Sequence, residues 1–274
     1  MPTLIPENTL PNGMKIFCIR KEEVPIIYGQ IQEYFQFGIE LHEDDTVFDV
    51  GANIGLFTLW VFHLCKTNVN VYAFEPIPDI FDVLQANAQR FEAEKIKVFP
   101  CGLSQESKTM NFAYYPNATA LSSAYPDGSK QQKNKFKNAI LRNLKDAPSQ
   151  VRWLRWLPSF LRSLILDKKL EKAFQVKQVT CQLRTISEII SEYNVQQIDL
   201  LKVDVERSEL DVLLGIEEQD WPKIKQVVVE VHDLDNRVQR ITDLFQKYGL
   251  SKVTVKQEPF KEGSDTFNLY ALRK

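Results

Sequence analysis

The chain contains the segment Asp49-Val50-Gly51-Ala52-Asn53-Ile54-Gly55, which follows one apolar run and precedes another. The preceding run, residues 45–50, has the pattern of a buried strand, and residues 56–65 have the pattern of an apolar helix. A glycine turn between a strand and a helix lets the backbone approach a ligand closely and points helix N-terminal amides at it. We therefore predict a ligand-binding turn at the carboxyl end of this strand.

The residues around the turn indicate the kind of ligand. Dinucleotide sites use the pattern G-x-G-x-x-G, whereas Gly51 and Gly55 form a G-x-x-x-G pattern directly after Asp49. A carboxylate there repels a phosphate and suits a cation, and S-adenosylmethionine carries an ammonium and a sulfonium group. Glu75 ends the next predicted strand, where α/β nucleotide sites place an acceptor for ribose hydroxyls. NAD has the same ribose, so Glu75 favours a cofactor site without separating the two cofactors.

Length and composition are those of a soluble globular protein, with 274 residues of which 44% are apolar and 26% charged. The N-terminus lacks the basic and apolar regions of a secretory signal, and no uncharged run reaches the roughly 20 residues that span a bilayer. We expect a cytoplasmic protein without a membrane span. The four cysteines are far apart, and no C-x-x-C pair indicates a zinc site or a disulfide framework.

Strand and helix patterns alternate through residue 104 and again from residue 185 to residue 248. Residues 251–257 and 266–272 then read as two strands, and their short connection requires antiparallel pairing. This order predicts an α/β fold of Rossmann-like type: a mostly parallel sheet with one antiparallel C-terminal strand and helices on both faces. We expect one domain, residues 1–274, made of an N-terminal segment 1–44, a cofactor-binding half 45–115, an insertion 116–178 and a second half 179–274.

The insertion is basic and aromatic. Residues 129–177 contain thirteen lysines and arginines against three acidic residues, a balance of +10 in a chain whose net charge is −2. It is either a helical cap whose apolar stripe packs on the sheet or a lid over the acceptor pocket whose outer face attracts an acidic partner. For the second alternative, Lys133, Lys135 and Lys137 are candidate docking residues. Contact with a membrane surface or with nucleic acid is less favoured, because Pro158 interrupts the helical pattern and the net charge is negative.

Polar residues follow the predicted strands 198–203 and 226–231. In an open sheet the carboxyl ends of the strands carry the site, and methyl transfer to a hydroxyl needs a base or a metal. Asp204, Glu206 and His232 occupy these ends. Because a free histidine has a pKa of roughly 6.5, His232 is our candidate general base, with Glu206 fixing its tautomer and Asp204 facing the sulfonium or the acceptor.

Other roles for these residues stay open. Asp204 is also a candidate N-cap for the following helix, whose positive end Glu206 would favour. Glu230 shares a strand face with His232 and is expected to pair with it or with Lys202. A metal site made of Asp204, Glu206 and His232 ranks second to a metal-independent site.

Four motifs in this order resemble the FkbM family of S-adenosylmethionine-dependent methyltransferases: FDVGANIG at 48–55, FEP at 74–76, IDLLKVDVE at 198–206 and VVEVH at 228–232. The resemblance covers residues 28–115 and 180–273. It implies a class I methyltransferase fold, S-adenosylmethionine as cofactor and O-methylation. Residues with an implied or assigned cofactor role are Asp49, Gly51, Asn53, Gly55, Glu75, Gly102, Leu103 and Asp204, and the active-site motifs carry Asp204, Glu206 and His232.

The chain departs from the family pattern at Arg207, where the family usually has a glycine after the glutamate. A side chain there restricts the backbone next to Glu206. It is also the one feature that would support a binding module without turnover.

The acceptor that the resemblance implies is a hydroxyl of a natural-product intermediate of the polyketide or nonribosomal peptide type. The basic insertion suggests that an acidic acyl carrier protein presents it. A sugar or another free small molecule is an alternative acceptor. An RNA methyltransferase that uses the insertion as its nucleic-acid face is a further alternative, although no nucleic-acid partner is expected.

Overall fold

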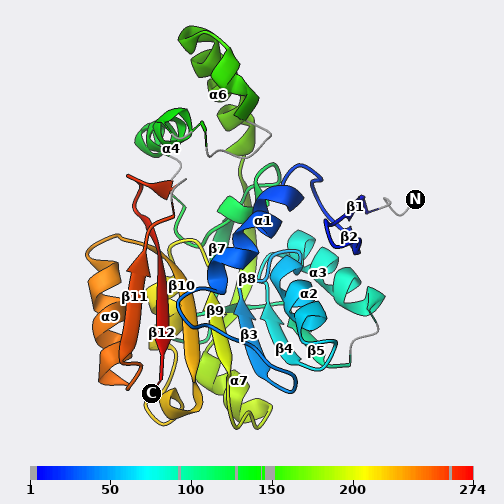
Figure 1. The fold of residues 1–274 in the computed structure, drawn as a ribbon, viewed down its shortest axis with the longest axis vertical. Helices are drawn as coiled ribbons and strands as arrows, with labels where there is room; N and C mark the ends of the chain where they lie inside the picture. Colours follow the sequence, from blue (N-terminus) through cyan, green and yellow to red (C-terminus); the bar gives the residue numbers. More distant parts are fainter. Residues whose placement is uncertain are drawn as a thin grey trace.

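The computed structural model describes residues 5–91, 94–126, 129–142, 144–145, 152–258 and 261–273. Within them, seven strands form the main sheet in the order β11-β12-β10-β9-β3-β4-β5 (Figure 1). Neighbours from β10 to β5 pair in parallel, and β12 runs antiparallel to both β10 and β11. This confirms the predicted sheet with one antiparallel strand. The strands are β3 (Thr46–Val50), β4 (Asn70–Phe74), β5 (Ile96–Phe99), β9 (Leu200–Val203), β10 (Gln226–His232), β11 (Lys252–Lys256) and β12 (Thr266–Leu272).

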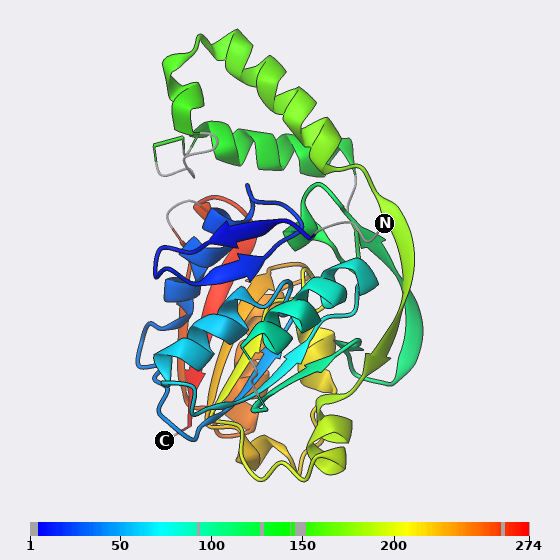
Figure 2. The same ribbon diagram turned by 90° about the vertical axis from the view of Figure 1, so that its right-hand side faces the viewer.

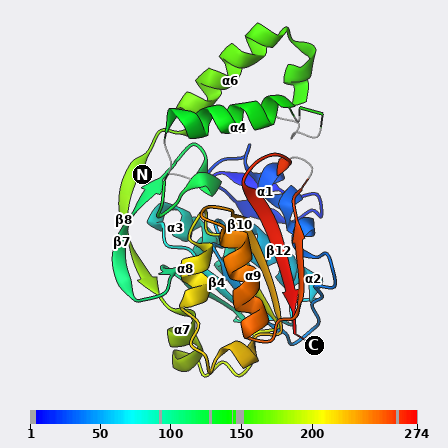
Figure 3. The same cartoon turned by 90° about the vertical axis from the view of Figure 1, so that its left-hand side faces the viewer.

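Helices cover both faces of this sheet because successive strand residues point to opposite sides. Val71 and Ala73 of β4 belong to one apolar cluster, and Tyr72 and Phe74 belong to the other. The first face is covered by α1 (Val24–Gln30), α2 (Leu56–Leu64) and α3 (Pro78–Arg90) (Figure 2). The second is covered by α7 (Ile186–Glu192), α8 (Glu209–Leu214) and α9 (Arg237–Lys247), with η4 (Trp221–Lys223) at its edge (Figure 3).

The N-terminal segment has regular structure that the sequence patterns did not predict. It forms the hairpin of β1 (Glu7–Thr9) and β2 (Lys15–Phe17), followed by α1 and η1 (Ile31–Tyr34). Asn87 of α3 holds β2 in place: its side-chain oxygen accepts from the backbone amide of Phe17 and its amide donates to the Phe17 carbonyl. The segment therefore packs against the cofactor-binding half.

A second, smaller sheet also lies outside the predictions. It has the order β6-β8-β7, made of β6 (Gly102–Leu103), β7 (Lys108–Tyr114) and β8 (Lys177–Arg184). Since β7 and β8 pair antiparallel over their whole length, they form the two-stranded base from which the insertion extends (Figure 2).

The insertion contains η2 (Thr119–Leu121), α4 (Lys130–Arg142), η3 (Trp153–Trp156) and α6 (Ser159–Ala173). Figure 1 shows α4 and α6 beyond the carboxyl ends of the parallel strands. Its apolar residues form a small cluster of their own, with Ile140, Leu144, Leu154 and Leu166 at its centre. Among the described residues, the apolar stripe of the insertion therefore packs inside the insertion. The cap alternative had placed this stripe on the sheet. Residues 143 and 146–151 of the basic block lie outside the described residues.

Candidate active site

The glycine turn after β3 has no space for a side chain. Gly51 has a φ of +77°, and a Cβ atom on it would lie 1.9 Å from the carbonyl oxygen of Asp204. The amides of Gly51 and Ala52 both donate to the carbonyl of Phe74, at 3.1 and 2.9 Å. The turn is therefore held between β4 and β9, so that its backbone lines a cavity.

Asp49 does not line this cavity, although its carboxylate was one of the features that predicted a positively charged cofactor. It is fully buried, and its carboxylate accepts from the Lys202 ammonium at 3.0 Å and from the Thr58 hydroxyl at 2.6 Å. Lys202 also donates to the carbonyl of Gly51 at 2.9 Å. Burial alone would lower the pKa of Lys202, but Asp49 and Asp204 outweigh burial and raise it. Asp49 thus stabilises the turn indirectly, because it holds the Lys202 ammonium that donates to the Gly51 carbonyl.

Glu75 lines the cavity at the end of β4. One of its oxygens accepts from the amide of Ile77 at 2.9 Å and the other from the amide of Asn53 at 3.1 Å. Burial raises the pKa of Glu75 to about 7, although these two donors oppose the shift. The carboxylate is therefore fixed in orientation, and each oxygen has a lone pair left for a further donor.

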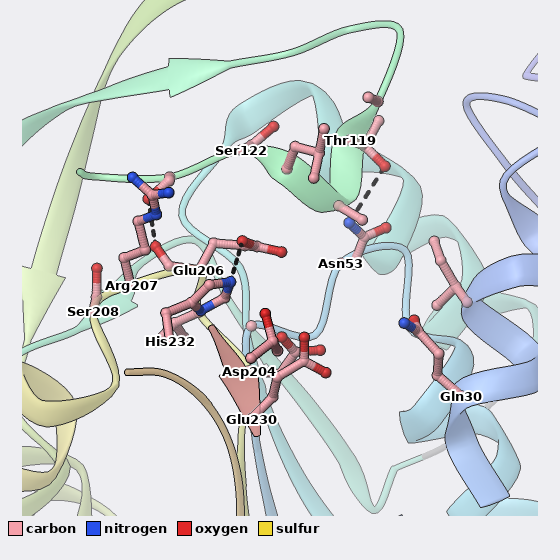
Figure 4. A pocket seen from close by; sticks show the side chains of 18 of the residues that line it. Gln30, Asn53, Thr119, Ser122, Asp204, Glu206, Arg207, Ser208, Glu230 and His232 are labelled. Atoms are coloured by element: carbon pink, nitrogen blue, oxygen red, sulfur yellow. Dashed lines mark hydrogen bonds and ion pairs between the residues drawn. The ribbon is translucent and has the colours of Figure 1, made fainter. Parts of the chain in front are cut away.

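The remaining predicted cofactor residues divide into two groups. Asn53, Gly102 and Leu103 line the cavity, with the Asn53 amide 3.4 Å from the Thr119 hydroxyl (Figure 4). Gly55 does not line it. With a φ of +87° it is the N-cap of α2, and a Cβ there would lie 2.7 Å from Leu84. Gly55 allows α2 to start and to pack closely on α3.

The cavity has a volume of about 1040 Å³, at the upper end of the range for small-molecule sites. Its lining includes the carboxyl ends of β3, β4, β9 and β10, the N-terminal helices α1 and η1, the small sheet, the β11–β12 connection and the insertion. Gln30 points into it from α1 (Figure 4). The position agrees with the predicted edge of the sheet, while the N-terminal contribution was missed.

Asp204 lines the cavity beside the glycine turn, and the Tyr34 hydroxyl of η1 donates to its carboxylate at 2.9 Å. The Lys202 ammonium is 3.9 Å from the same carboxylate. Burial and the negative charge of Asp204 raise the pKa of Tyr34 well above its usual value, so its hydroxyl remains a donor. The predicted N-cap role of Asp204 is not observed, because Ser208 is the N-cap residue of α8.

Glu206 and His232 lie side by side in the cavity, with 3.3 Å between a Glu206 oxygen and Nε2 of His232 (Figure 4). The other ring nitrogen, Nδ1, lies 2.8 Å from the carboxylate of Glu209, which is fully buried at the start of α8. The second Glu209 oxygen accepts from Arg237 of α9 at 2.8 Å. Glu206, His232, Glu209 and Arg237 thus form one chain of alternating charge.

The surroundings of His232 change the role predicted for it. Burial opposes the charged ring, but Glu206 and Glu209 outweigh it and hold the pKa of His232 well above its usual value. The same contacts lower the pKa of Glu209, although burial alone would raise it. These contacts favour the charged ring, in which both nitrogens donate to carboxylates, and so they count against His232 as the proton acceptor.

The backbone around Glu206 explains how the chain tolerates Arg207. Glu206 and Arg207 both lie in the left-handed region, with φ values of +45° and +77°, where glycine is favoured. The Arg207 amide donates to Glu209 at 2.7 Å, and its carbonyl accepts from Arg237 at 2.7 Å. The Glu206 carbonyl accepts from the Ser123 hydroxyl. These partners hold a conformation that is unfavourable for an arginine.

Glu230 pairs with neither predicted partner. Its carboxylate accepts from the Lys261 ammonium at 2.5 Å, and Lys261 comes from the β11–β12 connection, of which residues 259 and 260 lie outside the described part. Burial raises the pKa of Glu230, with Lys261 opposing. Asp204, Glu206 and Glu230 face the same space (Figure 4), so this end of the cavity carries an excess of carboxylates.

Sequence patterns missed Tyr34, Glu209, Arg237 and Lys261, which complete the site. Glu209 had a usable signal, since a glutamate three residues after Glu206 opens α8. The other three had none, because their partners are far away along the chain. Within the described residues, no group of three or more histidine, cysteine, aspartate or glutamate side chains could hold a metal ion. In the same part of the chain, no helix is long and apolar enough to cross a bilayer.

S-adenosylmethionine fits the residues that are present. Glu75 has the free acceptor positions that two ribose hydroxyls require, and Gly51 offers backbone without a side chain. Gly102 and Leu103 lie where the adenine is expected, and the Asp204 carboxylate supplies the charge that suits the ammonium or the sulfonium. The negative charge inferred from Asp49 is thus provided by Asp204.

Comparison with known proteins identifies the family of this chain. Residues 49–251 match the Methyltransferase FkbM domain. The chain is 34% identical to the 31-O-demethyl-FK506 methyltransferase FkbM of Streptomyces tacrolimicus, over 96% of this chain and 95% of that protein. It is 33% identical to the AMB antimetabolite synthetase AmbE of Pseudomonas aeruginosa, over 97% of this chain but 12% of that protein.

A solved structure supports the fold. The crystal structure of methyltransferase FkbM from Methylobacillus flagellatus KT aligns with a TM-score of 0.53 and 15% identity, over 89% of this chain and 47% of that one. The chain belongs to the FkbM family of methyltransferases, and S-adenosylmethionine is its cofactor.

Proposed function

We propose that this protein methylates a hydroxyl group of a natural-product intermediate that is bound to an acyl carrier protein. The observation that carries the proposal is one cavity with Glu75 and Gly51 at one end and the Glu206–His232 pair at the other. The relatives support the acceptor class, since one is named a 31-O-demethyl-FK506 methyltransferase and another is an antimetabolite synthetase of which this chain matches 12%. The basic insertion supports the carrier protein.

Glu206 is the group that we assign as proton acceptor. When bound, S-adenosylmethionine supplies an electrophilic methyl group on a positively charged sulfur. An acceptor oxygen that takes up the methyl group, while the bond between that group and sulfur breaks, would carry a strongly acidic proton, and the Glu206 carboxylate would be basic enough to take it. The charged His232 donates to Glu206 and fixes its orientation, while Glu209 and Arg237 hold His232.

Asp204 has a different role in this proposal. It lies between the turn and the pair, where its charge favours the positively charged donor and the Tyr34 hydroxyl and Lys202 ammonium fix its position. The Tyr34 hydroxyl and the Lys202 ammonium both lie against the Asp204 carboxylate, whereas the partner of the Glu206 carboxylate is the His232 ring. Glu206 is therefore the better placed of the two to meet an acceptor hydroxyl.

Substitution of Glu206 tests the assignment. We expect Glu206→Gln to lower turnover about 10²- to 10⁴-fold, the usual contribution of a general base, while calorimetry shows an unchanged affinity for S-adenosylmethionine. The assay is the gain of one CH₂ unit on a 3-hydroxyacyl carrier protein, followed by mass spectrometry. Glu217→Gln, at an exposed glutamate outside the cavity, is the matched control. Normal turnover by Glu206→Gln would contradict the assignment.

The pH profile separates Glu206 from His232 as the base. The pKa of His232 is raised well above its usual value, so the ring keeps its proton to a higher pH than a free histidine does. If the charged ring must hold Glu206, activity declines as the pH rises and that proton is lost. If neutral His232 were the base, activity would rise over the same pH interval.

A further inference from the structure

The tip of the insertion exposes large apolar side chains that its own small core does not use. Trp153, Trp156, Phe160 and Leu164 are 46%, 78%, 63% and 56% exposed, whereas Leu154 between the two tryptophans is fully buried. A continuous exposed patch of this kind marks a contact site on most soluble proteins. We call these four residues the tip patch.

Cationic side chains accompany the tip patch. Arg152, Trp153, Arg155 and Trp156 line a shallow groove of about 230 Å³. The Arg155 guanidinium lies 4.9 Å from the ring centre of Trp156, and Lys169 covers Trp153 at 5.9 Å. Guanidinium groups suit phosphate recognition because their donors match its oxygens. We call these four lining residues the tip groove.

The tip groove is held in shape before any partner arrives. Arg162 of α6 donates to the carbonyl of Leu157 at 2.6 Å and to the carbonyl of Arg155 at 2.8 Å. These bonds join η3 to the first turn of α6, and the buried Leu154 anchors η3 from below. A preformed site loses less conformational entropy when it binds.

Arg152 connects the tip groove with the active-site cavity, because it lines both. The insertion also contributes Asn138, Arg142 and Phe174 to the cavity. The cavity is therefore cationic toward the insertion and rich in carboxylates at the Glu206 end. A ligand that matches this order has an anionic group at the insertion and a neutral chain that reaches inward.

The lysines of α4 are less suited to docking than their sequence suggests. Lys137 is paired with Asp167 at 2.6 Å, and Lys133 lies over the ring of Phe174 at 5.3 Å. The side chain of Lys135 lies outside the described residues. Lys133 and Lys137 thus already have partners within the insertion, so Arg152 and Arg155 are the better candidates for docking.

We propose that the tip groove binds the phosphodiester of a phosphopantetheine arm, while the tip patch contacts the acidic carrier protein to which that arm is attached. This inference rests on the proposed function and names the contact that presents the acceptor. The neutral part of the arm then runs past Arg152 and Arg142 into the cavity and brings the hydroxyl toward Glu206. An anionic bilayer would satisfy the charge and the tryptophans, but it offers no chain that enters the cavity beside Arg152.

Binding to two small fragments tests the groove without any knowledge of the acceptor. By calorimetry, we expect phosphopantetheine to bind about tenfold more tightly than pantetheine, the effect of about one charge-assisted hydrogen bond. The double variant Arg152→Gln/Arg155→Gln should bind both fragments equally. The control Lys168→Gln/Lys172→Gln removes the same charge from exposed positions of α6 that line neither site, and it should keep the preference. Equal binding of both fragments by the wild-type protein would overturn the proposal.

Activity and vesicle binding complete the test. The arginine double variant should lose about tenfold more in kcat/KM on a 3-hydroxyacyl carrier protein than on the matching pantetheine thioester. If no thioester is methylated but the phosphate preference persists, the proposed function fails and the groove assignment survives. Binding to phosphatidylglycerol vesicles by the tip groove, without any phosphate preference, would identify a membrane contact and overturn the carrier assignment.

Discussion

Two regions that line the cavity, the carboxyl ends of the sheet strands and the insertion, differ in how their charged side chains are paired. At the sheet edge the buried charges have fixed partners: Asp49 pairs with Lys202, and Glu209 bridges His232 and Arg237. In the insertion, Arg152 and Arg155 are exposed beside exposed tryptophans. Buried ion pairs hold one geometry because separating them is costly, whereas exposed cations are screened and free to exchange partners. The buried pairs at the strand ends thus hold their side chains in one geometry, whereas the exposed cations of the insertion are free to change partners.

The largest effect that this comparison predicts is at Gly51. Gly51→Ala places a Cβ against the Asp204 carbonyl and forces an L-residue to a φ of +77°. We expect a loss of about 3 kcal/mol or more in the free energy of unfolding, measured in urea, and loss of S-adenosylmethionine binding. Gly29→Ala is the control: this helical glycine lines the same cavity with nothing within 4 Å. It should be neutral or stabilising by about 0.5 kcal/mol. Equal behaviour of the two variants would refute the fixed geometry.

The next effect concerns the buried pair behind the turn. Lys202→Met keeps the length of the side chain but leaves Asp49 uncompensated, so we expect a loss of about 3 kcal/mol in the free energy of unfolding. The double variant Asp49→Asn/Lys202→Met removes both charges and should recover part of that loss. Chemical denaturation of these two variants and of Asp49→Asn alone gives the coupling. Additive losses would show that Asp49 and Lys202 act separately.

A smaller effect is expected from the backbone at Arg207. Arg207→Gly and Arg207→Ala remove the same side-chain contacts, so their difference isolates the left-handed conformation. The glycine variant should be more stable than the alanine variant by about 1 kcal/mol, measured by urea unfolding. Activity on the acceptor should follow the same order, because Glu206 adjoins this residue. Two equally stable variants would indicate that the strain is absent.

The smallest effect should come from the insertion surface. Trp156→Ser and Phe160→Ser change exposed side chains, so we expect the free energy of unfolding to shift by less than about 0.5 kcal/mol. Leu154→Ala, at the buried neighbour, should lose about 2 kcal/mol or more. Thermal and urea unfolding check both expectations. A large loss at Trp156 would mean that the tip patch is structural.

Residue patterns along the chain were sufficient for the main sheet. The alternation of apolar runs, the glycine turn and the short final connection predicted β3, β4, β9 and β10 and the reversed β12, because each signal lies within one element. They did not predict β7 and β8, since a long interrupting insertion separates these paired strands. The N-terminal hairpin was missed for a related reason: its strands have three residues each, too short for a clear period.

The position of the site and the contact between Glu206 and His232 were likewise predictable, but most of the other contacts were not. Glu75, Asp204, Glu206 and His232 were expected at the carboxyl ends of strands, and all four line the cavity. The partner of Asp204 came from a distant segment, since Tyr34 lies 170 residues from it along the chain. Two carboxylates around His232 change its charge, and sequence spacing contains no information about that environment.

The order of residues along this chain was enough to establish a glycine turn, an α/β alternation and acidic strand ends, since hydrophobic period and backbone freedom are local properties. Only the folded structure shows that Asp49 pairs with Lys202 and does not face the cofactor site. It also places His232 between two glutamates that favour its charged form, and it brings Arg152 to the cavity. These are long-range contacts. Burial and partner charge set protonation, and both depend on side chains that become neighbours when the sheet, the N-terminal helices and the insertion pack together.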